Sequence, residues 1–131
     1  MLRSILAIAA GFFSICLLAF GADAILRAAM PEAFSPDGSV ESVQMLLFAI
    51  GYVLVFAVAG CYLTAHLAPN RPMRHALILG LLGLIFNIAG TIAFWHTAPA
   101  WFHIVSLLLV MPAAWLGGRL RRPQLRRPLT A

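Results

Sequence analysis

Residues 43–67 read VQMLLFAIGYVLVFAVAGCYLTAHL, a run of 25 positions without an aspartate, glutamate, lysine or arginine. A helix of about 20 predominantly apolar residues is long enough to cross the hydrocarbon core of a bilayer. Three similar stretches flank this run, at residues 5–26, 76–95 and 101–118, and Asp23 carries the only formal charge inside them. The pattern predicts four transmembrane helices.

The composition of the whole chain supports the same conclusion. Of its 131 residues, 63% are hydrophobic and 10% are charged. A soluble domain of this length buries too small a share of its surface to hide so many apolar side chains. We therefore predict an all-α membrane protein, an antiparallel bundle of four transmembrane helices in residues 1–118, followed by a basic tail at residues 119–131.

The connections between the apolar stretches differ in composition. Residues 28–42 contain two prolines, one glycine and three acidic residues, which predicts a water-exposed loop. Residues 68–75 contain two prolines and two arginines, and residues 96–100 form a turn short enough to impose an antiparallel hairpin. The tail RLRRPQLRRPLTA is basic and interrupted by proline, a composition typical of disordered segments.

Arginine is distributed unevenly between the two sides of the predicted bundle. With the N-terminus in the cytoplasm, eight of the nine arginines lie on the cytoplasmic side, and all four acidic residues lie at or beyond the outer boundary. Cytoplasmic loops carry an excess of basic residues, so the sequence predicts that both termini are cytoplasmic. Trp95 and Trp101 flank the outer turn, as expected of an interfacial aromatic belt. The inner arginines that would also contact anionic lipid headgroups, at about 1 kcal/mol each, are Arg71, Arg74, Arg119, Arg121 and Arg122.

Small residues recur at helical spacing and predict close helix–helix packing, since helices in lipid associate through small side chains and buried polar contacts. The positions are Gly11, Gly60, Gly80, Gly83 and Gly90. Asn87 lies on the same face of the third helix as its glycines. For this amide we favour an interhelical hydrogen bond of about 1 kcal/mol over a contact with a substrate or ion. Pro112 predicts a kink in the fourth helix.

Candidate chemistry is sparse. The sequence contains no catalytic residue set, cofactor motif, zinc-protease motif or Cys-x-x-Cys pair. His96 and His103 flank the predicted outer turn near Asp23, but no two histidines have the spacing of a helical ligand pair, so we predict no metal site. Asp23 and Arg27 are four residues apart and are expected to face each other, as a neutralised helix end or as an ion-coupled site. The arginines form no patch on a folded surface, so we expect no nucleic-acid partner.

Two similarities to known proteins can be compared with these observations. Small drug exporters have four helices in about this length and an acidic residue embedded in the first helix, whereas residues 11–16 read GFFSIC and contain no acid. Residues 60–77, GCYLTAHLAPNRPMRHAL, resemble the middle of uncharacterised small four-helix proteins of the bacterial inner membrane, in which the second helix is followed by Ala-Pro-x-x-Pro-x-x-His-Ala. This resemblance implies a multi-pass protein of that membrane and implies no activity.

Two functional hypotheses follow. The first is a non-enzymatic accessory or scaffold subunit that packs against a membrane-protein partner or further copies of itself through the small-residue faces. The alternative is a small oligomeric transporter or channel with Asn87, Asp23 and the Pro112 kink in its pathway. The ends of the second and fourth helices also resemble each other, which indicates either a duplicated hairpin or, as we favour, the general pattern of inner helix ends.

The predicted orientation is testable with reporter fusions. A fluorescent protein fused after Ala131 should fold and fluoresce in the cytoplasm, and alkaline phosphatase inserted at Gly38 should be active outside it. An extracytoplasmic C-terminus would contradict the assignment of the inner face.

Overall fold

The computed structural model describes the backbone of residues 2–125 and the side chains of residues 2–121. Four long helices are present in it: α1 (Leu2–Ala29), α2 (Val43–Leu67), α3 (Pro72–Ala93) and α4 (Ala100–Leu125). Two short 3-10 helices, η1 (Pro31–Ala33) and η2 (Trp95–Thr97), lie in the connections. Each long helix has the length and composition to cross a membrane. The predicted all-α bundle of four candidate spans is therefore confirmed.

Three of the four helices have ends that differ from the limits of the apolar stretches. α1 begins at Leu2 and ends at Ala29, and α3 begins at Pro72 and ends before Trp95. A proline is well suited to the first turn of a helix because its φ is already near the helical value. Backbone hydrogen bonds do not depend on side-chain hydropathy, so a helix can continue beyond the apolar stretch.

The fourth helix shows the largest difference. It is helical through Arg119 and onward to Leu125, where the sequence predicted the start of a disordered tail. The Arg119 guanidinium lies 4.7 Å from the centroid of the Trp115 ring. The two residues are four apart, and a helix places residues at this spacing next to each other. The helix also continues through Pro112. The rest of the predicted tail, residues 126–131, and Met1 lie outside the described residues.

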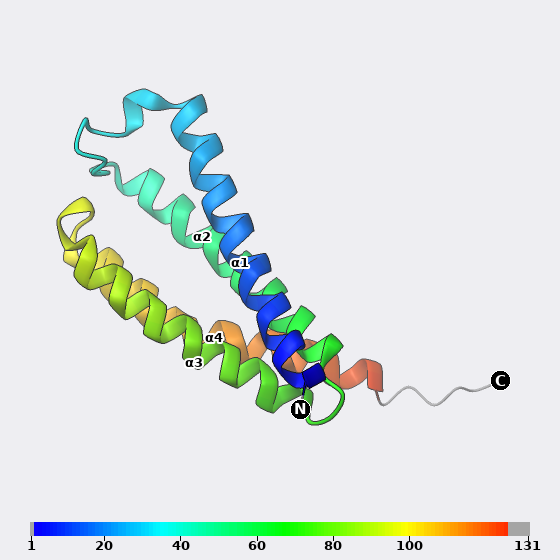
Figure 1. Cartoon of the computed structure of the whole chain (residues 1–131). Coiled ribbons are helices and arrows are strands. Elements are labelled where there is room, and N and C mark those ends of the chain that lie inside the picture. The colour runs from blue at the N-terminus through cyan, green and yellow to red at the C-terminus, as the bar shows by residue number, and fades with distance from the viewer. Residues whose placement is uncertain (1, 126–131) are drawn as a thin grey trace.

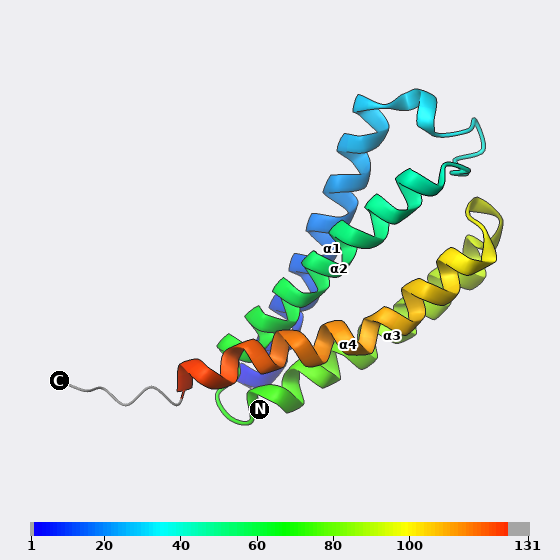
Figure 2. The same ribbon diagram turned by 180° about the vertical axis from the view of Figure 1, so that it is seen from behind.

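The helices form two antiparallel hairpins, α1–α2 and α3–α4 (Figures 1 and 2). One end of the bundle holds the start of α1, the connection at residues 68–71 and the end of α4, and we call it the closed end. The other end holds the loops at residues 30–42 and 94–99, and we call it the open end. The two hairpins meet at the closed end and diverge toward the open end (Figure 1). α2 contacts each of the other three long helices.

At the closed end, glycines that pack against small residues allow the helices to approach one another closely. A methyl group on Gly11 of α1 would stand 2.7 Å from the Gly60 carbonyl oxygen of α2. One on Gly117 of α4 would stand 2.7 Å from Cys61 Cβ of α2, and one on Gly80 of α3 would collide with Ala114 Cβ of α4. The backbones of all four helices therefore approach to a distance that a larger side chain would prevent.

A buried polar contact accompanies this packing. The Thr64 hydroxyl of α2 is fully buried and donates a hydrogen bond of 3.1 Å to the Ala7 carbonyl oxygen of α1. Interhelical hydrogen bonds in membranes contribute on average about 0.6 kcal/mol. The apolar core lies around it, in a cluster of Cys61, Ala65, Ala76, Leu79 and Ala114.

The outward face of the bundle is apolar over much of its length. Leu17 is 76% exposed, and Phe13, Ile92 and Leu108 are exposed to a similar degree. Such side chains are stable in contact with lipid tails, so the spans imply contact with membrane lipid.

The packing at the closed end gives a matched pair of variants. Gly11→Ala should destabilise the protein by about 1–3 kcal/mol, because its methyl group must displace the α2 backbone. Gly21→Ala on the same helix has no neighbour within 4 Å and should change stability by less than about 0.5 kcal/mol. Unfolding in mixed detergent–SDS micelles, followed by circular dichroism, would measure both. Equal stabilities for the two variants would contradict the close approach of α1 and α2.

Candidate ligand-binding cleft

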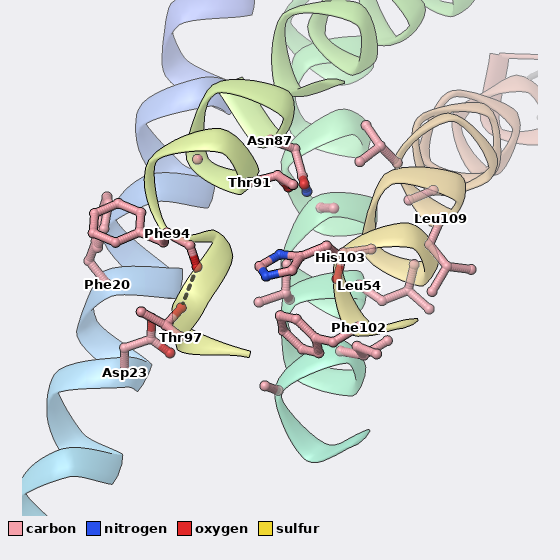
Figure 3. Close-up of a pocket in the computed structure, with 18 residues that line it drawn as sticks. Phe20, Asp23, Leu54, Asn87, Thr91, Phe94, Thr97, Phe102, His103 and Leu109 are labelled. Carbon is pink, nitrogen blue, oxygen red and sulfur yellow. Dashed lines mark hydrogen bonds between the residues drawn. The ribbon is translucent and has the colours of Figure 1, made fainter. Parts of the chain in front are cut away.

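A cleft of about 450 Å³ lies between the two hairpins, on the open-end side of the closed packing (Figure 3). Residues from all four long helices and from η2 line it. Its size lies within the range of about 300–1,000 Å³ that is usual for small-molecule sites. Twelve of the eighteen lining residues are apolar, among them Phe20, Leu54, Phe94, Phe102 and Leu109. The six polar lining residues are Asp23, Asn87, Thr91, Thr97, His103 and Ser106.

The polar lining residues of α4 lie toward the open end, and its deepest lining residues are apolar. His103 lies in the first turn of α4, at the open end, and Ser106 lies about one turn deeper. Below Ser106 the α4 lining continues with Leu109, Val110 and Ala113, and the deepest lining residue of α2 is Ala57. The cleft therefore has a mouth with hydrogen-bonding groups and a floor without them.

His103 is the most enclosed polar side chain of the cleft. It is 7% exposed, and its Nε2 atom is buried without a hydrogen-bond partner. The ring stacks on Trp95, with centroids 5.2 Å apart and planes at 17°, and the edge of Phe102 packs against it at 5.7 Å. Figure 3 shows the imidazole projecting into the space between α3 and α4. A buried polar atom without a partner costs about 1–3 kcal/mol, and the described residues leave this nitrogen unsatisfied.

Asn87 and the glycines of the predicted α3 face do not share one environment. Gly80 forms part of the closed packing, whereas Asn87 and Gly90 line the cleft, and nothing lies within 4 Å of the Cβ position of Gly90. At Gly83 the nearest atom is Val110 Cγ1, at an ordinary 3.8 Å. The Asn87 amide makes no hydrogen bond to another described residue, so the interhelical bond that we favoured remains a prediction. The cleft begins at its depth, although the neighbouring Phe86 ring still contacts Phe12 of α1, with centroids 4.9 Å apart.

Asp23 and Arg27 do not form the pair that their spacing predicted. The Tyr52 hydroxyl of α2 donates a hydrogen bond to Asp23 Oδ1 of α1. The Arg27 guanidinium instead lies 4.5 Å from the centroid of the Phe34 ring in the following loop. A cation–π contact with the loop and a hydroxyl donor on the neighbouring helix replace the local ion pair.

The loop at residues 30–42 is attached to the opposite hairpin at the mouth of the cleft. The Val40 amide donates a hydrogen bond of 2.9 Å to the carbonyl oxygen of Thr97 in η2. Within the loop, the Ser39 hydroxyl and amide donate to Asp37 at 2.8 and 3.1 Å and lower the pKa of its carboxyl group. The Thr97 hydroxyl donates to the Phe94 carbonyl oxygen at 2.8 Å, which fixes the turn (Figure 3). The diverging hairpins are thus held together at their tips.

The five arginines that we assigned to topology or lipid contact lie near the start of α3 and the end of α4. Arg71 precedes α3 with a left-handed φ of 49°, and Arg74 lies in the first turn of that helix. Arg119, Arg121 and Arg122 lie in the last turns of α4. All five therefore belong to the closed end of the bundle.

Sequence reasoning identified Asn87 and Asp23 but gave His103 no role in binding. The sequence led us to consider His103 only as a metal ligand, and we predicted no metal site there, while Thr91 and Ser106 are unremarkable on apolar helices. Only the convergence of α3 and α4 shows that they share a cavity. Among the described residues, no three His, Cys, Asp or Glu side chains come close enough to hold a metal ion.

Comparisons with known proteins give no further assignment. No protein-family model, no curated protein sequence and no solved structure matches the chain. The candidate function is therefore argued from the cleft itself.

The polar mouth of the cleft predicts access for water-soluble reagents. In a background with Cys16 and Cys61 replaced by alanine, Ser106→Cys should react with a methanethiosulfonate reagent added to membranes, because its side chain lines the cleft. Leu108→Cys, two residues along the same helix and 69% exposed on the apolar surface, should react much more slowly. Mass spectrometry of the modified protein measures both rates. Equal rates would contradict an accessible cleft.

Proposed function

We propose that this multi-pass membrane protein binds a small, largely apolar molecule in the cleft and carries it between the membrane and one aqueous side without catalysing a reaction on it. The observation that supports this most directly is the asymmetry of the bundle, which glycine packing closes at one end and a lined cleft opens at the other. A cleft in which a few convergent polar groups interrupt apolar walls is typical of small-molecule sites.

The orientation belongs to the same proposal. The closed end contains Arg3, Arg71, Arg74 and Arg119, and basic residues near helix ends favour the cytoplasmic side. The closed end then faces the cytoplasm of a bacterium, both termini are cytoplasmic, and the mouth of the cleft opens at the outer face of the inner membrane. The acidic residues Glu32, Asp37 and Glu41 belong to the loop at this mouth.

The transporter hypothesis gains support from the structure over the accessory hypothesis. Of the three residues that we placed in a pathway, Asn87 and Asp23 line the cleft, whereas Pro112 is not among its lining residues. The accessory hypothesis was based on five glycines at helical spacing. Three of them already pack against helices of the same chain: Gly11, Gly60 and Gly80. An accessory role keeps one observation in its favour, since Gly21 and Gly51 are exposed with no neighbour within 4 Å and would admit a helix of a partner or second copy.

Filling the cleft should remove the bound molecule. Gly90 lines the cleft with open space at its Cβ position, so Gly90→Trp should occupy the volume that a ligand needs. Gly51→Trp places the same side chain in open space that is not part of the cleft lining. Each protein is purified in mild detergent, and its bound small molecules are extracted and identified by mass spectrometry. Wild-type protein and the Gly51→Trp variant should carry bound molecules, and the Gly90→Trp variant should not.

Two outcomes would decide against the proposal. If all three proteins carried the same molecules in the same amounts, the cleft would not be the binding site. If Gly51→Trp instead removed a co-purifying membrane protein or converted an oligomer to a monomer, with no effect of Gly90→Trp, the accessory hypothesis would be favoured.

A further inference from the structure

The residues that line the cleft also indicate which class of molecule it binds. This inference depends on the proposed binding function. We propose that its ligand is a neutral amphipathic lipid, with an oxygen-bearing head that His103 Nε2 hydrogen-bonds at the mouth and an apolar tail that lies on the floor.

The His103 ring is held in a fixed orientation before any ligand binds. Stacking on Trp95 and edge contact with Phe102 cover two sides of the imidazole. The ring is more than nine-tenths buried, and its Nε2 atom has no hydrogen-bond partner. The nitrogen can donate to a carbonyl oxygen or accept from a hydroxyl group, depending on its tautomer. A ligand oxygen at this point would satisfy it.

Further hydrogen-bonding groups lie around the same part of the cleft. Thr91 and Asn87 project from α3 on the side facing His103, as Figure 3 shows, and Ser106 lies about one turn below it on α4. These groups are hydroxyls and an amide, each able to donate and accept. They suit an alcohol, ester, amide or ketone.

The charges at the cleft argue for a neutral head. Of the described lining residues, Asp23 alone carries a formal charge, and it lies at the mouth and already accepts a hydrogen bond from the Tyr52 hydroxyl. No arginine lines the cleft, so a carboxylate or phosphate would lose its hydration without gaining a cationic partner. A cationic head beside His103 would find a single acidic lining residue among those described, Asp23, whose carboxylate already accepts a hydrogen bond from Tyr52. A neutral head is therefore favoured over both charged classes.

The apolar residues in the deep part of the cleft favour a ligand with an apolar tail. From His103 to Ala113 the cleft descends ten residues of α4, or about 15 Å along the helix axis. This depth is about half the ~30 Å thickness of the hydrocarbon core, so a chain entering from the open-end leaflet would reach the middle of the bilayer. Leu109, Val110 and Ala57 offer only apolar contact there. A sugar or an amino acid would find no hydrogen-bond partner on this floor.

The experiment uses the full-length protein in lipid nanodiscs and three photoreactive probes with the same diazirine-bearing sixteen-carbon chain. One probe ends in a hydroxyl group, one in a carboxylate and one in a methyl group. We expect wild-type protein to be labelled by the alcohol about tenfold more than by the other two, at residues of the cleft. His103→Leu should abolish this preference, and His103→Gln, which keeps a hydrogen-bonding side chain, should retain most of it.

The outcomes separate the ligand class from the proposed function. If the three probes label wild type equally, or the carboxylate leads, while Gly90→Trp still removes the labelling, the cleft binds molecules but the assignment of a neutral head is wrong. If Gly90→Trp leaves all labelling unchanged, the proposed binding function itself is wrong. The wild-type comparison decides the head group even if a His103 variant fails to fold, and an undiminished alcohol preference in folded His103→Leu would overturn the role of His103.

Discussion

The arrangement of this protein depends on the contact between backbones at the closed end. Lipid tails are as apolar as leucine, so burial of apolar surface gives helices in a bilayer little reason to associate with one another. Close approach through small residues and buried polar contacts supplies the attraction instead. Gly11 against Gly60, Gly80 against Ala114 and Gly117 against Cys61 connect the four helices pairwise, and the Thr64 hydrogen bond to Ala7 adds a polar contact in the same layer.

The cleft follows from where this packing stops. α1 has Gly11 at the contact, but Gly21, almost three turns further along, has no neighbour, and α3 changes in the same way from Gly80 to Gly90. Larger side chains such as Phe20, Phe94 and Phe102 line the cleft toward the open end. The hydrogen bond from Val40 to Thr97 joins the tips of the two hairpins, so the separation is bounded at both ends.

The proposed binding function depends on polar groups that have no hydrogen-bond partner among the described residues. A membrane protein of this size has few ways to satisfy a polar atom away from water, and most of its polar side chains find a backbone carbonyl oxygen or a neighbouring residue. Thr64, Ser14 and Thr97 follow that rule. Asn87 and His103 do not, and both lie in the cleft. This combination supports the proposed binding site over a packing defect, because a defect between apolar helices would have no polar lining.

The sequence by itself determined the four candidate spans, the helical fold and the order of the hairpins, because uninterrupted apolar stretches of sufficient length can satisfy their backbone in lipid only as helices. It also predicted five glycines as packing residues, but only the tertiary structure separates Gly11, Gly60 and Gly80, which pack closely, from Gly90, which lines the cleft. The site was decided only by the tertiary structure. Whether His103 faces lipid, water or a cavity depends on the separation of α3 and α4 from α2, and that separation depends on side-chain contacts between residues far apart in the chain. For the same reason Asp23 pairs with Tyr52 rather than with Arg27. Local spacing brings two groups within reach, but the neighbouring helix determines which partner is bound.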